Sequence, residues 1–205
     1  MLIDKTVKGF VEATASNEPV PGGGSVAALT ASISAALGEM VANLTIGKKK
    51  YVEVEEEMKG IAEKLGTCRQ VLLEYIDKDA KSFDEVMKAY GMPKETDAEK
   101  AARSAAIQEA MKDAAAVPLA VAKSTFDLLE PIKAVVIRGN SNAVTDGAVA
   151  AMMARTGVLS ALYNVKINLA SINDEEFVSK VSADVARLET EVVRVEQEIL
   201  AAVKL

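Results

Sequence analysis

The segment from Ser25 to Ile46 constrains the fold more strongly than any other part of the chain. It reads SVAALTASISAALGEMVANLTI, is rich in alanine and serine, and has Glu39 as its only charged residue. A helix that is apolar around most of its circumference is buried, and small side chains let neighbouring backbones approach closely. We therefore expect a central helix that other elements surround.

The other segments also have the patterns of helices. Aromatic residues make up 4% of the chain, tryptophan is absent, and long stretches are rich in alanine, glutamate, lysine and valine. Apolar residues recur at intervals of three, four and seven over residues 54–90 and again over 177–199. The run IKAVVI at 132–137 has strand propensity, but a lone strand would have no partner here, so we expect a helix.

Several polar residues predict where these helices start. Asp4 and Asn173 are the expected N-caps of the first and last helices. Thr96, followed three residues later by Glu99, has the pattern of a capping box. The predicted fold class is all-α, a single-domain bundle of about six to eight helices around a buried small-residue central helix, over residues 1–205.

Charge and composition exclude several functional classes. The net charge of −6 argues against nucleic acid as a partner, because nucleic-acid-binding proteins concentrate positive charge. The chain has no histidine, so it lacks the usual general base near neutral pH and the commonest metal ligand. We therefore expect no metal site, and any catalysis must use carboxylates, lysines, tyrosines or backbone dipoles.

The chain carries no sequence signal for secretion or membrane insertion. Its first ten residues include Asp4, Lys5 and Lys8, where a signal peptide would be apolar, and no run of about 18 uncharged apolar residues occurs. The single Cys68 allows no internal disulfide and lies in a helical pattern, which favours a structural role. We expect a cytoplasmic protein that does not bind membranes.

The stretch PVPGGGS at residues 19–25 is the most unusual local motif. It does not match the spacing of phosphate-binding or dinucleotide-binding loops, and no strand is predicted before it. Three consecutive glycines exceed what a helix cap needs, since each loses backbone entropy on ordering. Exposed N–H groups at a helix start bind anions. We therefore interpret Gly22, Gly23, Gly24 and Ser25 as a place where a ligand approaches bare backbone.

Other polar clusters accompany this motif. The central helix carries a carboxylate and an amide one turn apart, Glu39 and Asn43, and a lysine run, Lys48, Lys49 and Lys50, follows that helix. A later asparagine-rich loop contains Asn140 and Asn142 and is followed by Asp146. Asn164 and Asn168 lie one turn apart on a later predicted helix. Asp77 and Asp79 lie within an amphipathic helix, where aspartate has mediocre propensity. Solvated caps and helix-capping asparagines are the alternative interpretations.

Together these stretches resemble a known family. The segments PVPGGGSVAALTASISAALGEMVANLTIGKKKY, DKDAKSFDEVMKAYGMPKET, GNSNAVTDGAVAAMMA and ALYNVKINL are similar to the cyclodeaminase domain of formiminotransferase-cyclodeaminase and to its free-standing bacterial relatives, which include methenyltetrahydrofolate cyclohydrolases. The resemblance covers nearly the whole chain. It implies an all-helical domain that forms homodimers and binds a tetrahydrofolate derivative, with or without a polyglutamate tail, in a cleft lined by these segments.

The resemblance implies one of two reactions, and the sequence does not separate them. A cyclodeaminase closes 5-formimidoyltetrahydrofolate to 5,10-methenyltetrahydrofolate with release of ammonia. A cyclohydrolase adds water to 5,10-methenyltetrahydrofolate and yields 10-formyltetrahydrofolate. Both need proton transfer and stabilisation of positive charge, which a carboxylate supplies without histidine and without a cofactor beyond the folate. A folate-binding protein without catalysis and a helical interaction module remain alternatives.

The resemblance also suggests roles for individual residues. Asp146 or Asp79 would be the acid/base carboxylate, with Asp146 preferred because it follows the asparagine-rich loop. Glu39 is a reserve candidate, or else a charge that only reaches the helix end or a partner. The residues expected to bind the substrate are Gly22, Gly23, Gly24, Ser25, Asn43, Lys48, Lys49, Lys50, Asn140, Asn142 and Asn164. Among these, the four asparagines would bind the pterin edge or the formyl-level carbon, and the lysines would pair with the glutamate carboxylates of the folate.

Overall fold

The computed structural model describes residues 1–204, a range that contains helices and no strands. The elements in chain order are η1 (Leu2–Asp4), α1 (Val7–Thr14), α2 (Gly23–Thr45), η2 (Lys49–Val54), α3 (Glu55–Tyr90), α4 (Asp97–Phe126), α5 (Leu129–Arg138), η3 (Ser141–Ala143), α6 (Val144–Leu169) and α7 (Glu175–Ala201). The predicted all-α class is confirmed, and the run 132–137 lies in α5.

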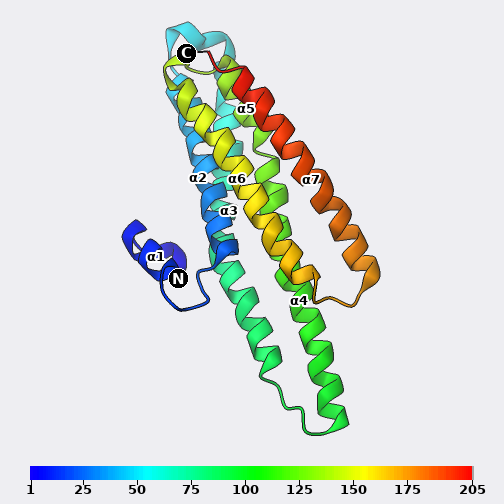
Figure 1. Ribbon diagram of the computed structural model, residues 1–205. Helices are drawn as coiled ribbons and strands as arrows, with labels where there is room; N and C mark the ends of the chain where they lie inside the picture. The colour runs from blue at the N-terminus through cyan, green and yellow to red at the C-terminus, as the bar shows by residue number, and fades with distance from the viewer. Residues whose placement is uncertain (205) are drawn as a thin grey trace.

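Helix α2 is the centre of the bundle, as its composition predicts. It packs along α3 and α6 and also contacts α4 and α5 (Figure 1). Ala27, Ala28, Ala31 and Ala35 are fully buried, because each faces a neighbouring helix at close range. A Cβ on Gly157 of α6 would lie 3.3 Å from Ala31, so the absence of side chains allows the two backbones to approach.

Helix α1 stands apart from this bundle. It lies beside the start of α2 and projects away from the other helices (Figure 1), and Phe10 is its one buried residue. The preceding turn η1 is anchored by Asp77 of α3, whose carboxylate accepts hydrogen bonds from the backbone N–H groups of Leu2 at 2.7 Å and Ile3 at 3.4 Å. The buried Asp77 therefore has a structural role that explains its place within α3.

Two predicted helix caps differ from the structure. Thr6 rather than Asp4 caps α1, and its hydroxyl accepts a hydrogen bond from the Gly9 N–H. Asp174 rather than Asn173 caps α7, because its carboxylate reaches the N–H of Phe177 at 3.0 Å. Both predictions were one or two residues early, since several neighbouring polar residues can serve as caps. The capping box at the start of α4 is confirmed.

The two most apolar helices are α2 and α6. By length and composition alone each would be able to cross a membrane, yet 56% and 44% of their most apolar windows are buried within the protein. Central helices of a bundle have this character because their surroundings are other helices. The smaller buried share in α6 leaves one of its faces uncovered.

Candidate functional site

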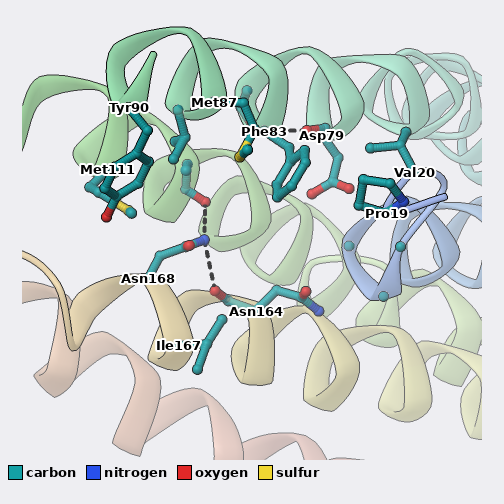
Figure 2. Close-up of a pocket in the computed structure, with 16 residues that line it drawn as sticks. Pro19, Val20, Asp79, Phe83, Met87, Tyr90, Met111, Asn164, Ile167 and Asn168 are labelled. Carbon is teal, nitrogen blue, oxygen red and sulfur yellow. Dashed lines mark hydrogen bonds between the residues drawn. The ribbon is translucent and has the colours of Figure 1, made fainter. Parts of the chain in front are cut away.

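A pocket opens at the start of α2, where α2, α3, α4 and α6 converge (Figure 2). Its volume is about 410 Å³, within the range of small-molecule sites. The loop before α2 forms one wall through Pro19 and Val20. The other lining residues are Gly22, Gly23, Gly24, Asp79, Ser82, Phe83, Val86, Met87, Tyr90, Met111, Ala114, Asn164, Ile167 and Asn168.

Asp79 is the one acidic side chain among these lining residues. Its Oδ2 accepts a hydrogen bond from the Ser25 hydroxyl at 2.9 Å, and Ser25 itself is fully buried. Burial raises the pKa of Asp79 above its ordinary value, and hydrogen bonds from the Ser25 side chain and backbone oppose that rise in pKa. A carboxyl group with a raised pKa beside a pocket is suited to taking up and returning a proton.

The glycines of the PVPGGGS motif make room for polar side chains. A Cβ on Gly24 would lie 2.0 Å from Oδ1 of Asp79, so this carboxylate occupies the space that a side chain would need. A Cβ on Gly23 would lie 3.2 Å from Nδ2 of Asn164. The first N–H groups of a helix have no carbonyl partner within it, and here they face the pocket end of α2. The motif therefore brings bare backbone next to an acid and an amide.

The rest of the pocket is largely apolar. Phe83, Met87 and Tyr90 follow Asp79 along α3 and form one side of the pocket, and Asn164, Ile167 and Asn168 form the opposite side (Figure 2). The exposed fraction is 36% for Phe83, 53% for Met87 and 70% for Ile167. Exposed large apolar side chains around a few polar groups are typical of a site for a flat, partly apolar ligand.

The structure brings together part of the predicted site. Gly22, Gly23, Gly24, Asp79 and Asn164 line the pocket, and Ser25 lies beneath it and holds Asp79.

The other predicted residues lie at the far end of α2, about 33 Å along its axis. They are Asn43, Lys48, Lys49, Lys50, Asn140, Asn142 and Asp146, and none of them lines the pocket. Within one chain, Asp146 and Asp79 therefore belong to separate clusters.

Asn140 and Asn142 have structural partners at that far end. The Asn140 side chain donates a hydrogen bond to the Leu44 carbonyl at 2.9 Å, and its backbone N–H donates one to Thr45 Oγ1 at 2.8 Å. Its Oδ1 accepts a hydrogen bond from the Asn142 N–H at 3.1 Å. These contacts join the loop before α6 to the last turn of α2, where carbonyl groups lack helical partners.

Glu39 also has a structural partner. Its carboxylate forms an ion pair with Arg69 of α3, with Oε2 2.7 Å from Nε and Oε1 3.4 Å from Nη2. Gly66 leaves room for this contact, since a Cβ there would lie 3.1 Å from Oε1. Of the two interpretations of Glu39, the geometry supports the ion pair, and the residue does not line the pocket.

Several lining residues were not among the predicted ligands. Phe83, Met87 and Tyr90 follow Asp79 at helical intervals, so the combination of an acid and an apolar stripe on one face was the available signal. Asn168 lies one turn beyond Asn164 and shares its face. The sequence gives no reason to place Pro19 and Val20 in the pocket, because they line it only through the path of the loop before α2.

An all-helical bundle with a carboxylate at a glycine-rich helix start, facing an apolar pocket, has the arrangement of an enzyme that acts on a small molecule. The chain matches the formiminotransferase-cyclodeaminase family over residues 6–187, and it belongs to that family.

The relatives agree with this assignment. The chain is 42% identical over 201 residues to a methenyltetrahydrofolate cyclohydrolase of Methylorubrum extorquens, covering 98% of this chain and 97% of the relative. It is 35% identical to a formimidoyltransferase-cyclodeaminase of Sus scrofa over 91% of this chain, but spans only 35% of that longer protein. These similarities identify the chain as a folate one-carbon enzyme.

A solved structure is similar over nearly the whole chain. The formiminotetrahydrofolate cyclodeaminase of Thermotoga maritima superposes with a TM-score of 0.89 and 32% sequence identity, covering 99% of this chain and 98% of that one. Sequence and structural similarity together therefore extend to relatives that carry each of the two activities in their names.

Proposed function

We propose that the protein is a methenyltetrahydrofolate cyclohydrolase, which hydrolyses 5,10-methenyltetrahydrofolate to 10-formyltetrahydrofolate. The observation that carries this proposal is the position of Asp79, whose carboxylate lies against the bare start of α2 inside an apolar pocket. The full-length similarity to a cyclohydrolase supports this choice of reaction.

Asp79 would act as both base and acid in this reaction. A water molecule adds to the methenyl carbon while Asp79 takes one of its protons, which leaves a neutral tetrahedral intermediate. The bond between that carbon and N5 then breaks, N5 receives a proton from Asp79, and the hydroxyl loses its proton as the formyl group forms on N10. The net reaction consumes one water and releases one proton.

The environment of Asp79 suits this cycle. The methenyl bridge carries a positive charge, which a nearby carboxylate stabilises most strongly where water is excluded. Burial raises the pKa of Asp79, which makes the carboxylate a better base, and the Ser25 hydroxyl holds it in place. The proposal requires no metal and no cofactor beyond the tetrahydrofolate substrate.

Cyclodeaminase activity is the second candidate, favoured by the similarity to the Thermotoga maritima enzyme. In that reaction N10 of 5-formimidoyltetrahydrofolate, which is protonated on its formimidoyl nitrogen, attacks the formimidoyl carbon and ammonia leaves. Asp79 would accept the N10 proton and return it to the departing nitrogen, so the same carboxylate serves both reactions.

The two reactions are distinguished by supplying each substrate separately to the purified protein. Accelerated loss of methenyl absorbance without ammonia supports the cyclohydrolase, whereas ammonia release coupled to methenyl formation supports the cyclodeaminase. Substitution Asp79→Asn keeps the size of the side chain, and we expect it to abolish turnover. Wild-type turnover by this variant would refute the role of Asp79, and binding without turnover in the wild type would leave a non-catalytic folate-binding protein.

We also propose that the protein is a homodimer that pairs α2 and α6 with their copies. Large apolar side chains recur at helical intervals on the exposed faces of these neighbouring helices: Ile33, Met40, Leu44, Val149, Met152, Tyr163 and Ile167. Exposed apolar surface of this extent marks an association surface.

An antiparallel pairing would connect the two separated clusters. It would place the basic segment Lys48–Lys50 of one protomer near the pocket of its partner, because the two α2 helices run in opposite directions. The lysines are exposed and would pair there with the glutamate carboxylates of the folate.

A further inference from the structure

We infer that Asn164 and Asn168 present two amide oxygens to the ligand and bind the hydrogen-bond-donating edge of its pyrimidine ring. In a tetrahydrofolate this edge carries the 2-amino group and the N3–H group. The inference rests on the proposed function, because it assumes a reduced folate in the pocket. It adds Asn168 to the site and gives the bound ring an orientation.

The orientation of the Asn168 amide follows from its partners. Its Nδ2 donates hydrogen bonds to the backbone carbonyl of Ala114 at 2.7 Å and to the backbone carbonyl of Asn164 at 3.0 Å (Figure 2). Carbonyl oxygens only accept hydrogen bonds, so the NH₂ group must face both of them. The two bonds use both Nδ2 hydrogens, and Oδ1 is the only atom of this amide left for a ligand.

The Asn164 amide is held by one hydrogen bond of the same kind. Its Nδ2 donates to the Ser160 carbonyl at 2.9 Å, one turn earlier on α6. Within residues 1–204, neither Asn164 Oδ1 nor Asn168 Oδ1 accepts a hydrogen bond, and no buried side-chain polar atom lacks a partner. Both oxygens are therefore accessible from the pocket that these residues line.

Two free acceptors select a ligand edge that donates. The pyrimidine ring of a tetrahydrofolate carries adjacent donors at the 2-amino group and N3, whereas an amide oxygen cannot pair with a ring edge that only accepts. An acceptor that a bound ligand covers without supplying a donor is costly, so these contacts discriminate between ligands with and without the donor.

The position of the asparagines relative to Asp79 agrees with this orientation. The Asn164 side chain lies next to the position that a Cβ on Gly23 would take, and the Asp79 carboxylate lies where a Cβ on Gly24 would be. The Cα atoms of these consecutive glycines are about 3.8 Å apart, so acid and amide flank the same start of α2. N5 and N10 lie on the opposite side of the pterin from the 2-amino group. A ring held by its pyrimidine edge therefore directs the one-carbon unit away from the asparagines.

The test measures binding of tetrahydrofolate and of its analogue with a methyl group in place of the 2-amino group, using titration calorimetry. We expect the wild-type protein to bind the analogue about tenfold to a hundredfold more weakly. In Asn164→Ala and Asn168→Ala the ratio of the two dissociation constants should fall at least threefold, because the acceptor that reads the amino group is gone. An unchanged ratio in both variants, or no discrimination in the wild type, would overturn the inference.

Thr190→Ala is the matched control. Its hydroxyl donates to the Ala186 carbonyl one turn earlier, at 3.1 Å, and it lies on α7 away from the pocket. This variant should bind both ligands as the wild type does, which separates ligand recognition from the loss of a helix contact. Since binding does not depend on turnover, a protein that binds tetrahydrofolate with the expected ratio but hydrolyses nothing would refute the proposed reaction alone.

Discussion

The space beside Gly24 is the clearest single-residue determinant of the site. A methyl group there would lie 2.0 Å from Asp79 Oδ1, so the carboxylate must move if alanine replaces the glycine. We expect Gly24→Ala to remain folded, because the residue lies in the first turn of α2, and to lose at least tenfold in kcat/KM. Steady-state kinetics together with circular dichroism measure the two effects.

Gly60 provides the comparison for this substitution. It lies within α3, and a Cβ there would contact nothing within 4 Å. Gly60→Ala should raise the free energy of unfolding by about 0.5–1 kcal/mol, because alanine favours the helix, and should leave kcat/KM unchanged. Equal activities for the two variants would show that Gly24 does not make room for a catalytic carboxylate.

The same carboxylate makes stability depend on pH. The raised pKa of Asp79 means that the folded protein disfavours its charged form. This destabilisation is absent below the unfolded pKa of about 3.8 and increases as the pH rises through the folded pKa. Asp79→Asn removes the charge and keeps an acceptor for Ser25, so its Tm relative to wild type should rise as the pH increases above about 3.8. Calorimetry at several pH values tests this, and a relative Tm that falls over this range would contradict it.

At the level of residues, the sequence predicted the contents of the pocket only in part. Gly24, Asp79 and Asn164 were predictable because glycines, an unexpected helical acid and an amide are chemically conspicuous. The preference for Asp146 came from its polar loop, and a loop motif carries no information on its distance from another motif. That distance depends on the length of the helix between them.

The loop from Gly139 to Ala143 caps the C-terminal end of helix α2. Because the Asn140 side chain satisfies the Leu44 carbonyl, Asn140→Ala should lower the free energy of unfolding by about 1 kcal/mol. Activity with a monoglutamyl substrate should stay within twofold of wild type. Urea unfolding measures the stability and steady-state kinetics measure the activity. A loss of activity without a loss of stability would indicate that Asn140 binds the substrate.

The helices themselves were largely predictable, for physical reasons that differ between them. The single charged residue in α2 predicts a buried helix, and the apolar stripes of α3 and α7 predict which face of each helix is buried. The detachment of α1 was not predictable, because its stripe of Val7 and Val11 has the pattern of a packed helix and yet faces solvent, with exposed fractions of 85% and 61%.

The apolar faces of α2 and α6 lead to a prediction for the whole molecule. Ile33→Asp combined with Met40→Asp places two charges on the proposed dimer surface, where both side chains are exposed in the single chain. Light scattering after gel filtration should show a dimer for the wild type and a monomer for this variant. Val71→Asp, at an exposed apolar position on α3, should remain dimeric. A monomeric wild type would refute the proposal.

The proposed contact between the lysine segment Lys48–Lys50 and the glutamate tail of the folate can be tested in the wild-type dimer. Replacement of Lys48, Lys49 and Lys50 by glutamine should raise KM for a polyglutamylated substrate severalfold and leave KM for the monoglutamate unchanged. The effect on the polyglutamate should weaken with salt, since exposed charges are screened. Equal KM changes for both substrates would contradict a role limited to the tail.

The anchoring of η1 bears on how this fold is joined to other proteins. Asp77 holds the backbone N–H groups of Leu2 and Ile3, not the terminal amine, which pairs only with the exposed Asp4. A polypeptide linked ahead of Met1 would leave both of these hydrogen bonds intact. The helical fold is therefore compatible with a polypeptide joined ahead of it.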